Sequence, residues 1–415
     1  IVARVLGLDV TAIEKEMHTI GDLGSLVAQY EWSSSEPLTV TQVYNALDSL
    51  EKIAGTGSQE KKAEALETLL QQVDPISAKY IIRMVLATLR LGFSDMTLID
   101  ALSWMEVGDK SLRPVLEHAY NVCADSGLLA YTLKQEGIEA VKHMRIHVGI
   151  PIRPAAAERL ASAQEIIEKI GPCVVEPKLD GFRLQVHVSK TDKDTVIRFF
   201  SRNLLDMSAM FPEFVKACAL LPVKEVIIDG EAIVYDPNAG TFVPFQETVK
   251  RRRKHGIDEL VSELPLQLNV FDIMYLDGQS LLHKEQKTRR HMLDEIFKNY
   301  TQQHHVQKSS VVSKKSAEQL SVFSNTIHQK DSSNFETQTI QMIEEVFVTT
   351  AQELENYFTK EIAAGLEGVV VKKQDAQYQA GKRNFNWIKL KYQASEKLQD
   401  TLDVVILGYY PGRGK

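Results

Sequence analysis

The hydrophobic pattern divides the chain into a helical first part and a strand-rich second part. From residue 1 to about residue 144, apolar positions recur with helical spacing and few stretches alternate as strands do. The clearest stretch is 77–105, which we expect to form a buried core helix. Two apolar rows run along it, the first formed by Ile81, Val85 and Leu89 and the second by Ile82 and Leu86.

The segment 149–154 ends the helical pattern. Pro151 and Pro154 push the residues before them into extended conformation, so this segment predicts a domain boundary. A short helix is expected over 161–170, and strands then dominate to about residue 392. Further on, the apolar run within 400–410 predicts a strand that opens another domain.

One stretch inside the strand-rich part departs from its pattern. Residues 299–341 are polar and biased in composition, which predicts a surface insertion in part of this range. His304 and His305 lie within it. Because no further ligands follow at suitable spacing, the pair favours a solvated loop over a metal site.

Composition narrows the class of protein. A chain of 415 residues with 44% hydrophobic content can form two or three domains with cores, and both of its ends look cut, as in a fragment. The formal net charge of -7 means that any contact with nucleic acid must use local basic patches. Only Cys123, Cys173 and Cys218 are present, which indicates a reducing interior rather than disulfides or a zinc site. Since we find no signal peptide and no apolar run that could span a bilayer, we expect an intracellular protein without a membrane partner.

The candidate chemistry centres on the segment 176–183. Lys178 stands beside a tight Asp-Gly turn, between the apolar strand 173–175 and an alternating strand over 184–188. A lysine amine can act as a nucleophile when nearby cations or desolvation lower its pKa and a rigid backbone aims it. The segment therefore predicts a nucleophilic Lys178 at the rim of a sheet. An ordinary hairpin with an exposed lysine is the alternative.

Acidic and aromatic residues recur in the later strands. The strand 226–232 carries carboxylates in its interior, which is costly unless they have charged or hydroxylic partners. Phe271 is an aromatic candidate for the site, and a core position is its alternative. Alternation puts Glu367 and Lys372 on opposite faces of one strand, so both reach a single site only through a bulge or a strand end. Glu367 is the favoured site residue of the two.

The strand 387–391 provides two further cations. A period of two sends Ile388 and Leu390 to the core and Lys389 and Lys391 to the other face. Two ammonium groups that face one pocket would stabilise phosphate charge and depress the pKa of Lys178 by repulsion. A solvated basic strand face is the alternative.

These motifs occur in the order that one family uses. Lys-x-Asp-Gly-x-Arg at 178–183, Ser-Arg-Asn at 201–203 and the later strands resemble the motifs of covalent nucleotidyltransferases, in particular the ATP-dependent DNA ligases of archaeal and eukaryotic type. The resemblance implies a multidomain α + (α+β) fold. Its parts would be an all-helical DNA-binding domain (1–146), an antiparallel-sheet-rich, ATP-grasp-like nucleotidyltransferase domain (147–394) and the first strand of an OB-fold (395–415).

The resemblance also implies roles for individual residues. Lys178 would carry a covalent adenylate, Glu176 would read the adenine amino group, and Phe271 would stack on the adenine ring. Glu231 would contact the ribose or, together with Glu367, hold Mg²⁺. The other contacts to the ribose and phosphates of ATP would come from Arg183, Arg202, Arg383, Lys389 and Lys391.

The implied function is the sealing of nicks in double-stranded DNA during replication, repair and recombination. The resemblance implies a monomer in the cytoplasm or nucleoid, or in the nucleus of a eukaryote, with a sliding clamp as a candidate partner. We predict phosphate contacts from Arg83, Arg90 and the basic run 250–255, for which a solvated face is the alternative. An RNA ligase or capping-type nucleotidyltransferase, an NAD-dependent ligase and a non-catalytic DNA-clamping module stay open as other interpretations.

Overall fold

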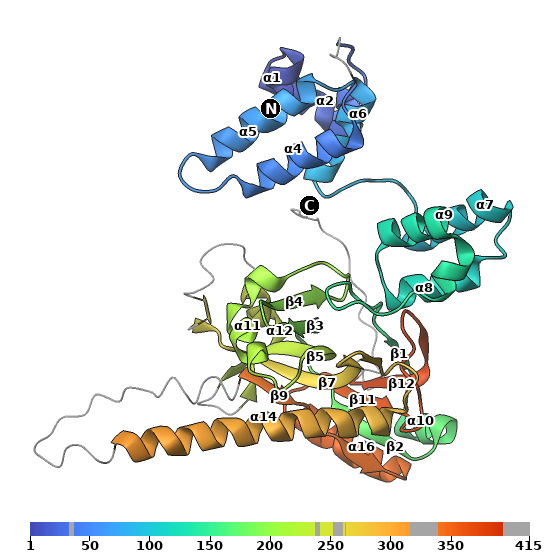
Figure 1. Cartoon of the computed structure of the whole chain (residues 1–415), viewed down its shortest axis with the longest axis vertical. Helices are drawn as coiled ribbons and strands as arrows, with labels where there is room; N and C mark the ends of the chain where they lie inside the picture. The colour runs from blue at the N-terminus through green and yellow to red at the C-terminus, as the bar shows by residue number, and fades with distance from the viewer. Residues whose placement is uncertain (33–36, 237–240, 252–259, 262, 316–338, 393–415) are drawn as a thin grey trace, which may run out of the picture. The chain divides into compact units, whose positions relative to one another are not determined.

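The computed structural model describes residues 1–32, 37–236, 241–251, 260–261, 263–315 and 339–392, without the side chains of 302–315. The chain divides into two compact units, Ile1–Thr97 and Leu98–Lys415. Both units are drawn in Figure 1.

The first unit is built of short helices, four of which begin at a residue whose side chain caps the helix. They are α1 (Val2–Leu6), α2 (Val10–Ile20), α3 (Leu23–Val27), α4 (Val40–Lys52), α5 (Ser58–Gln71) and α6 (Pro75–Val85). The side chains of Asp9, Asp22, Thr39 and Asp74 accept hydrogen bonds from backbone amides at the starts of α2, α3, α4 and α6. The helical character predicted for this part of the chain is therefore confirmed.

The single helix predicted over 77–105 is wrong, because two helices occupy this range. Between α6 and α7 (Asp95–Val107), Ala87 and Arg90 take positive φ angles of 53° and 49°, which interrupt a helix. Ile81 and Ile82 are buried as expected. The apolar residues at and after the end of α6 are instead exposed, namely Val85, Leu86 and Leu89.

The second unit continues with helices and then turns to sheets. Its next helices are α8 (Arg113–Val122) and α9 (Ser126–Lys142). The proline-containing segment that follows is held by two buried polar side chains of β3 (Phe182–Lys190). His187 Nδ1 accepts a hydrogen bond from the Gly149 amide at 2.9 Å, and Gln185 Oε1 accepts one from the Ile152 amide at 2.7 Å. The domain boundary placed at this segment stays a prediction.

Two largely antiparallel sheets form the rest of the second unit. The first has the order β1 (Ala156–Arg159), β12 (Arg383–Lys391), β11 (Gly368–Lys372), β2 (Cys173–Pro177), β10 (Val346–Val348). The second has the order β4 (Thr195–Ser201), β3, β5 (Glu225–Asp236), β7 (Leu266–Leu276), β8 (Gln279–Ser280), with β6 (Thr241–Phe242) on β5 and β9 (Ile340–Met342) on β7. Only the pairs β1–β12 and β7–β9 are parallel among the described strands. The antiparallel-sheet-rich character is confirmed.

Helices cover the outer faces of these sheets (Figure 1). Side chains of α10 (Ala163–Ile170) and α16 (Ala351–Ala363) share a core with β2, β11 and β12. Those of α11 (Pro212–Ala219) and α14 (Gln286–Lys315) share a core with β3, β5 and β7. Three shorter helical segments complete the unit: η1 (Ser208–Met210), α12 (Phe245–Thr248) and η2 (Val249–Arg251).

The remaining expectations from sequence have different outcomes. The helix α14 continues through the start of the expected insertion, 299–341. Near the end of this insertion, the buried residue Ile340 pairs with Leu268 of β7. Residues 316–338 and the expected OB-fold strand after residue 392 lie outside the described residues. All three cysteines are buried free thiols, so no disulfide forms. No helix within the described ranges is both long and apolar enough to cross a bilayer.

Candidate active site

Lys178 lies where the chain passes from one sheet to the other. It follows β2 of the first sheet and precedes β3 of the second, and these two strands do not pair with each other. The simple hairpin alternative is therefore wrong, and the predicted position at a sheet rim is confirmed. The backbone amide of Lys178 donates to the carbonyl of Gly368 at 2.9 Å. At Gly181 a Cβ would lie 2.2 Å from the Ala232 carbonyl oxygen, so only glycine allows this close crossing.

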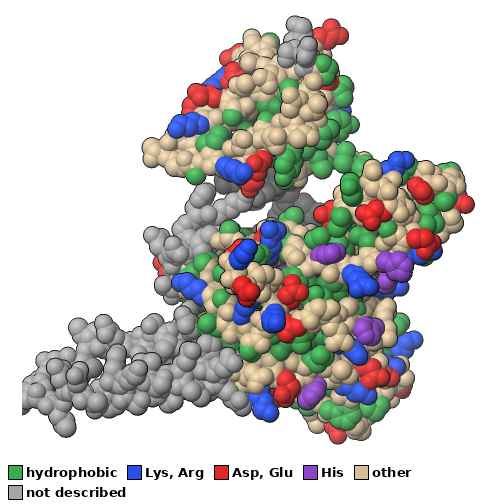
Figure 2. Space-filling model, viewed as in Figure 1, with side chains coloured by type: hydrophobic (Ala, Val, Ile, Leu, Met, Phe, Trp, Pro, Cys, Tyr) green, Lys and Arg blue, Asp and Glu red, His purple; other side chains and the backbone are tan. Residues whose placement is uncertain are grey.

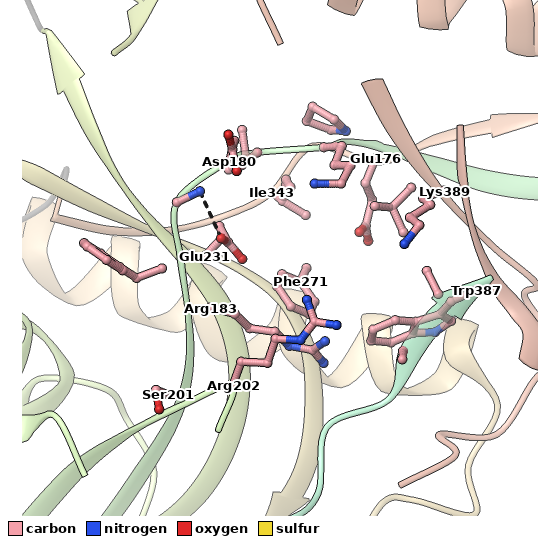
Figure 3. Close-up of a pocket in the computed structure, with 18 of the residues that line it drawn as sticks. Glu176, Asp180, Arg183, Ser201, Arg202, Glu231, Phe271, Ile343, Trp387 and Lys389 are labelled. Atoms are coloured by element: carbon pink, nitrogen blue, oxygen red, sulfur yellow. Dashed lines mark hydrogen bonds between the residues drawn. The ribbon is translucent and has the colours of Figure 1, made fainter. Parts of the chain in front are cut away.

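A cavity of about 1180 Å³ opens beside this crossing. Its walls come from both sheets, as Figure 3 shows. Arg183 and Arg202 extend into the same space from neighbouring strands, and Lys389 reaches toward it from the other sheet. Of the predicted site residues, the cavity is lined by Lys178, Glu176, Arg183, Arg202, Glu231, Phe271, Lys389 and Lys391.

Glu367 bridges two of the lysines. Its Oε2 accepts a hydrogen bond from Lys178 Nζ, and its Oε1 accepts one from Lys391 Nζ. Burial favours the neutral acid, but the hydrogen bonds from Lys178 and Lys391 outweigh it and hold the pKa of Glu367 below its ordinary value. The carboxylate therefore holds the ammonium of Lys178 in place and partly neutralises the basic wall.

A break in strand geometry brings both Glu367 and Lys372 to this region. Gly368, the first residue of β11, has a φ of 150°, and a Cβ there would lie 2.1 Å from the Leu390 carbonyl oxygen. Glu367 thus lies beyond the regular alternation of the strand, while Lys372 lies inside it. The sequence analysis required a bulge or a strand end for both residues to reach one site, and the start of β11 at Gly368 is such a strand end. Lys372, the less favoured of the two in the sequence analysis, lines the cavity.

The alternation predicted for β12 is confirmed. Ile388 and Leu390 lie in a core, whereas Lys389 and Lys391 line the cavity. Burial lowers the pKa of Lys389, and the positive charges of Arg383, Lys391, Lys178 and Arg202 lower it further. A concentration of positive charge of this kind is suited to a polyphosphate.

Buried partners hold the carboxylates and the arginine of the second sheet. Arg183 Nη2 donates to Asp229 Oδ2 at 2.6 Å, and the Tyr378 hydroxyl donates to the same oxygen at 3.0 Å. Glu231 Oε1 accepts from the Gly181 amide at 3.0 Å, and burial raises the pKa of Glu231 to about 7. The expectation that interior carboxylates of this strand need charged or hydroxylic partners is thus confirmed for Asp229. Asp229 was expected to need such a partner but was given no role of its own, and Tyr378 carries no motif signal and was not predicted.

A buried ion pair joins two neighbouring strands of the first sheet, β11 and β2, at the wall of the cavity. Lys372 Nζ lies 2.7 Å from Glu176 Oε1. The rings of Phe271 and Trp387 meet edge to face with centres 6.0 Å apart, and both line the cavity. Trp387 was missed as a site residue, although strand alternation puts it on the same face of β12 as Lys389 and Lys391.

Arg202 and Arg383 occupy more open positions. Arg202 follows β4, is exposed and lines the cavity. Arg383 begins β12, is exposed and does not line the cavity, although its charge acts on Lys389. The nucleotide contacts expected from both stay predictions.

Two of the arginines expected to contact DNA phosphates are buried in ion pairs, so these two predictions are wrong. In the first unit, Arg83 Nε donates to Asp22 Oδ2 at 3.0 Å, and the hydrogen bonds from Arg83 lower the pKa of Asp22. In the second, Arg251 is bonded to Glu213, and the residues 252–255 lie outside the described ranges. Arg90 is exposed and stays a candidate. Acidic and basic side chains are otherwise interspersed on the face shown in Figure 2.

Comparisons with known proteins show which family of proteins the chain resembles along its length. A family profile described as "ATP dependent DNA ligase domain" matches residues 154–333 and 330–391, and one described as "DNA ligase N terminus" matches residues 1–103. A probable DNA ligase of Dictyoglomus thermophilum is 41% identical over 413 residues, which cover 99% of this chain and 64% of that protein. A DNA ligase of Sulfolobus acidocaldarius is 35% identical over 97% of this chain and 63% of its own length. The chain thus spans less than two thirds of the length of these relatives.

Among solved structures, a mycobacterial DNA ligase D complexed with ATP and MES aligns with a TM-score of 0.37 and 22% identity, over 58% of this chain and 60% of that one. The family matches favour a DNA ligase over an RNA ligase, a capping-type enzyme or an NAD-dependent ligase. Because the first profile spans more than half of the 415 residues, the chain belongs to the family of ATP-dependent DNA ligases.

Proposed function

We propose that the protein seals nicks in double-stranded DNA with ATP, through an adenylate carried on Lys178. The observation that carries this proposal is the ion pair of Lys178 with Glu367 beside a cavity that Lys178, Lys389 and Lys391 line, in a chain of this family. A nucleophilic amine, its alignment and a cationic wall are what a phosphoryl transfer requires.

Three transfers make up the proposed reaction. The Lys178 amine attacks the α-phosphorus of ATP, so that an N–P bond forms, the bond from this phosphorus to the bridging oxygen breaks, and pyrophosphate leaves. The amine proton must be lost, and Glu367 Oε2 is a suitable acceptor because it already binds this amine. A 5′-phosphate oxygen at the nick then attacks the same phosphorus and breaks the N–P bond. Finally, the 3′-hydroxyl attacks the 5′-phosphate, which joins the strand and releases AMP.

The residues of the cavity would share the binding of ATP. Glu176 would accept from the adenine amino group and Phe271 would contact the ring. Glu231 would contact the ribose. Phosphate and ribose oxygens would be bound by Arg183, Arg202, Arg383, Lys389 and Lys391.

Mg²⁺ is the metal that this chemistry implies. Within the described residues, no three carboxylate, histidine or cysteine side chains converge as a metal site. Glu231 fits as a single ligand, since among the described residues only its Oε1 accepts a hydrogen bond, and Mg²⁺ commonly combines one or two carboxylates with substrate phosphates. Both oxygens of Glu367 are taken by lysines, so its proposed metal role requires that at least one lysine be released. Bound Mg²⁺ would screen the charge of the phosphates.

The wider assignments belong to the same proposal. Residues 1–146 would bind the duplex, 147–394 would carry out adenylation, and 395–415 would open an OB-fold. We further propose a monomer that acts inside the cell in replication, repair and recombination, with a sliding clamp as a candidate partner.

The test is ligation by the full-length protein of a 5′-phosphorylated nick in a DNA duplex, compared with the same nick in an RNA duplex. Sealing of DNA with ATP supports the proposal, and sealing of RNA alone would refute it.

A further inference from the structure

The wall behind the cavity holds a lysine to which the transfer chemistry assigns no part. Lys372 Nζ lies 2.7 Å from Glu176 Oε1 and 2.9 Å from the carbonyl oxygen of Phe271. It also lies 5.0 and 4.9 Å from the ring centres of Phe271 and Trp387, and only 1% of the residue is exposed. These contacts fix the ammonium in one place. Lys372 therefore acts on Glu176 rather than on solvent.

Glu176 presents one oxygen to Lys372 and has the other available. Its Oε1 accepts the hydrogen bond from Lys372, whereas Oε2 accepts none from the described residues. The side chain lines the cavity and is only 2% exposed (Figure 3). An available oxygen of a buried side chain at the wall of a nucleotide-sized cavity is suited to read a donor or an acceptor on a ligand.

The charge of Glu176 depends on its neighbours. Burial raises its pKa to about 7, against the attraction of Lys372 from β11. Arg290 from α14 also favours the carboxylate, whereas Glu345 disfavours it. Burial raises the pKa of Tyr357 on α16, and the negative charge of Glu176 raises it further. Among the described residues, only Lys372 donates a hydrogen bond to this carboxylate, so removal of Lys372 would favour the neutral acid near pH 7.

The two forms of Glu176 select different purines. Adenine carries an amino donor at C6, whereas guanine and hypoxanthine carry a carbonyl acceptor there. A carboxylate can only accept, so it pairs with the amino group and repels the carbonyl. A carboxylic acid can donate, and it would tolerate the carbonyl.

We infer that Lys372 sets the purine selectivity of the cavity: by keeping Glu176 an acceptor, it admits adenine nucleotides and excludes 6-oxopurine nucleotides. The inference rests on the proposed nucleotidyl transfer and makes Lys372 a positioning residue for base recognition. It differs from the phosphate-binding role of the lysines on β12.

The experiment compares ATP with ITP in the full-length protein. ITP differs from ATP only at C6 and N1, where the amino group becomes a carbonyl and N1 gains a hydrogen, and it has no 2-amino group, so it tests this edge of the base. The ratio of kcat/KM for adduct formation with ATP to that with ITP is measured for the unaltered protein, Lys372→Met and Lys372→Arg. Lys373→Met is the matched control, because Lys373 is a partly exposed neighbour paired with Asp375 at 3.4 Å.

We expect Lys372→Met to lower the ATP-to-ITP ratio by at least about tenfold, because a site built for one hydrogen-bond pattern then loses its discrimination. Lys372→Arg should restore most of the ratio, and Lys373→Met should leave it unchanged. In the unaltered protein the ratio should fall as the pH drops below about 7, where Glu176 gains a proton. An equal loss of activity with both nucleotides in Lys372→Met would show a merely structural role and overturn the inference.

A second variant covers the case in which Lys372→Met does not fold. Glu176→Gln keeps the size of the side chain but presents either a donor or an acceptor, so it should also lose the preference for ATP. A ratio that stays high in Glu176→Gln would overturn the inference. If the unaltered protein forms no adduct with ATP, the proposed function fails, and equilibrium binding of AMP against IMP by the same variants still decides the role of Lys372.

Discussion

The ammonium of Lys178 and the carboxylate of Glu367, 189 residues apart in the sequence, form an ion pair where the two sheets of the second unit meet. The other oxygen of Glu367 binds Lys391, so one carboxylate holds two cations. Gly368 makes this possible because β11 begins at this residue, so Glu367 lies just before the regular strand. The position of the Lys178 amine therefore depends on a residue far away in the chain.

Glu367→Gln should slow the transfer of AMP to the protein by about 10–100-fold, because an amide cannot hold both lysines as the carboxylate does. The rate of radiolabelled adduct formation measures this effect. Glu355→Gln on the exposed face of α16 is the control and should retain full activity. A Glu367→Gln variant as fast as this control would show that the ion pair has no part in the reaction.

The ion pair of Lys178 and Glu367 should make the stability of the folded protein depend on pH. Because the pKa of Glu367 is lowered in the folded protein, the pair stabilises the fold above the ordinary glutamate pKa, and this contribution is lost as the pH falls through the lowered value. The side chain is 31% exposed, so we expect less than about 1 kcal/mol. The unaltered protein should have a higher unfolding temperature than Glu367→Gln at pH 7 but not at pH 3. A difference that grows on acidification would contradict this sign.

Gly368→Ala should damage both the fold and the site. A Cβ at this position would lie 2.1 Å from the Leu390 carbonyl oxygen, so β11 and β12 would have to separate. We expect a loss of about 3 kcal/mol in the free energy of unfolding, measured by urea denaturation, and loss of adenylation. Gly365→Ala is the control, because its φ is also positive but a Cβ there meets nothing within 4 Å, so it should cost only about 1 kcal/mol. Equal costs for the two variants would refute the steric argument.

Arg83 and Arg90 should behave differently although both were expected to contact DNA. Arg83→Met breaks a buried pair with Asp22 and should destabilise the first unit by about 3–5 kcal/mol in urea denaturation. Arg90 is largely exposed, so Arg90→Gln should change stability by less than about 0.5 kcal/mol. If Arg90 binds a phosphate, its loss should reduce the slope of log affinity for nicked DNA against log salt by about 1. An unchanged slope would remove Arg90 from the DNA-binding surface.

Local patterns in the sequence were sufficient for some features and not for others. The alternation of β12 predicted which side chains face the core and which face the cavity, because a strand has a fixed period of two. Gly92, with a φ of 73°, signals the break after α6, whereas Ala87 and Arg90 adopt positive φ without any such signal. The burial of Arg83 and Arg251 was missed because their acidic partners, Asp22 and Glu213, lie far away in the sequence.

The central claim is a covalent bond between Lys178 Nζ and the phosphorus of AMP. The direct measurement is peptide mass spectrometry of the full-length protein after incubation with ATP and Mg²⁺, with Lys178→Ala as the comparison. The account predicts an AMP adduct mapped to Lys178 in the unaltered protein and none in a folded Lys178→Ala variant. An adduct that persists in this variant, or that maps to a different side chain, would contradict it.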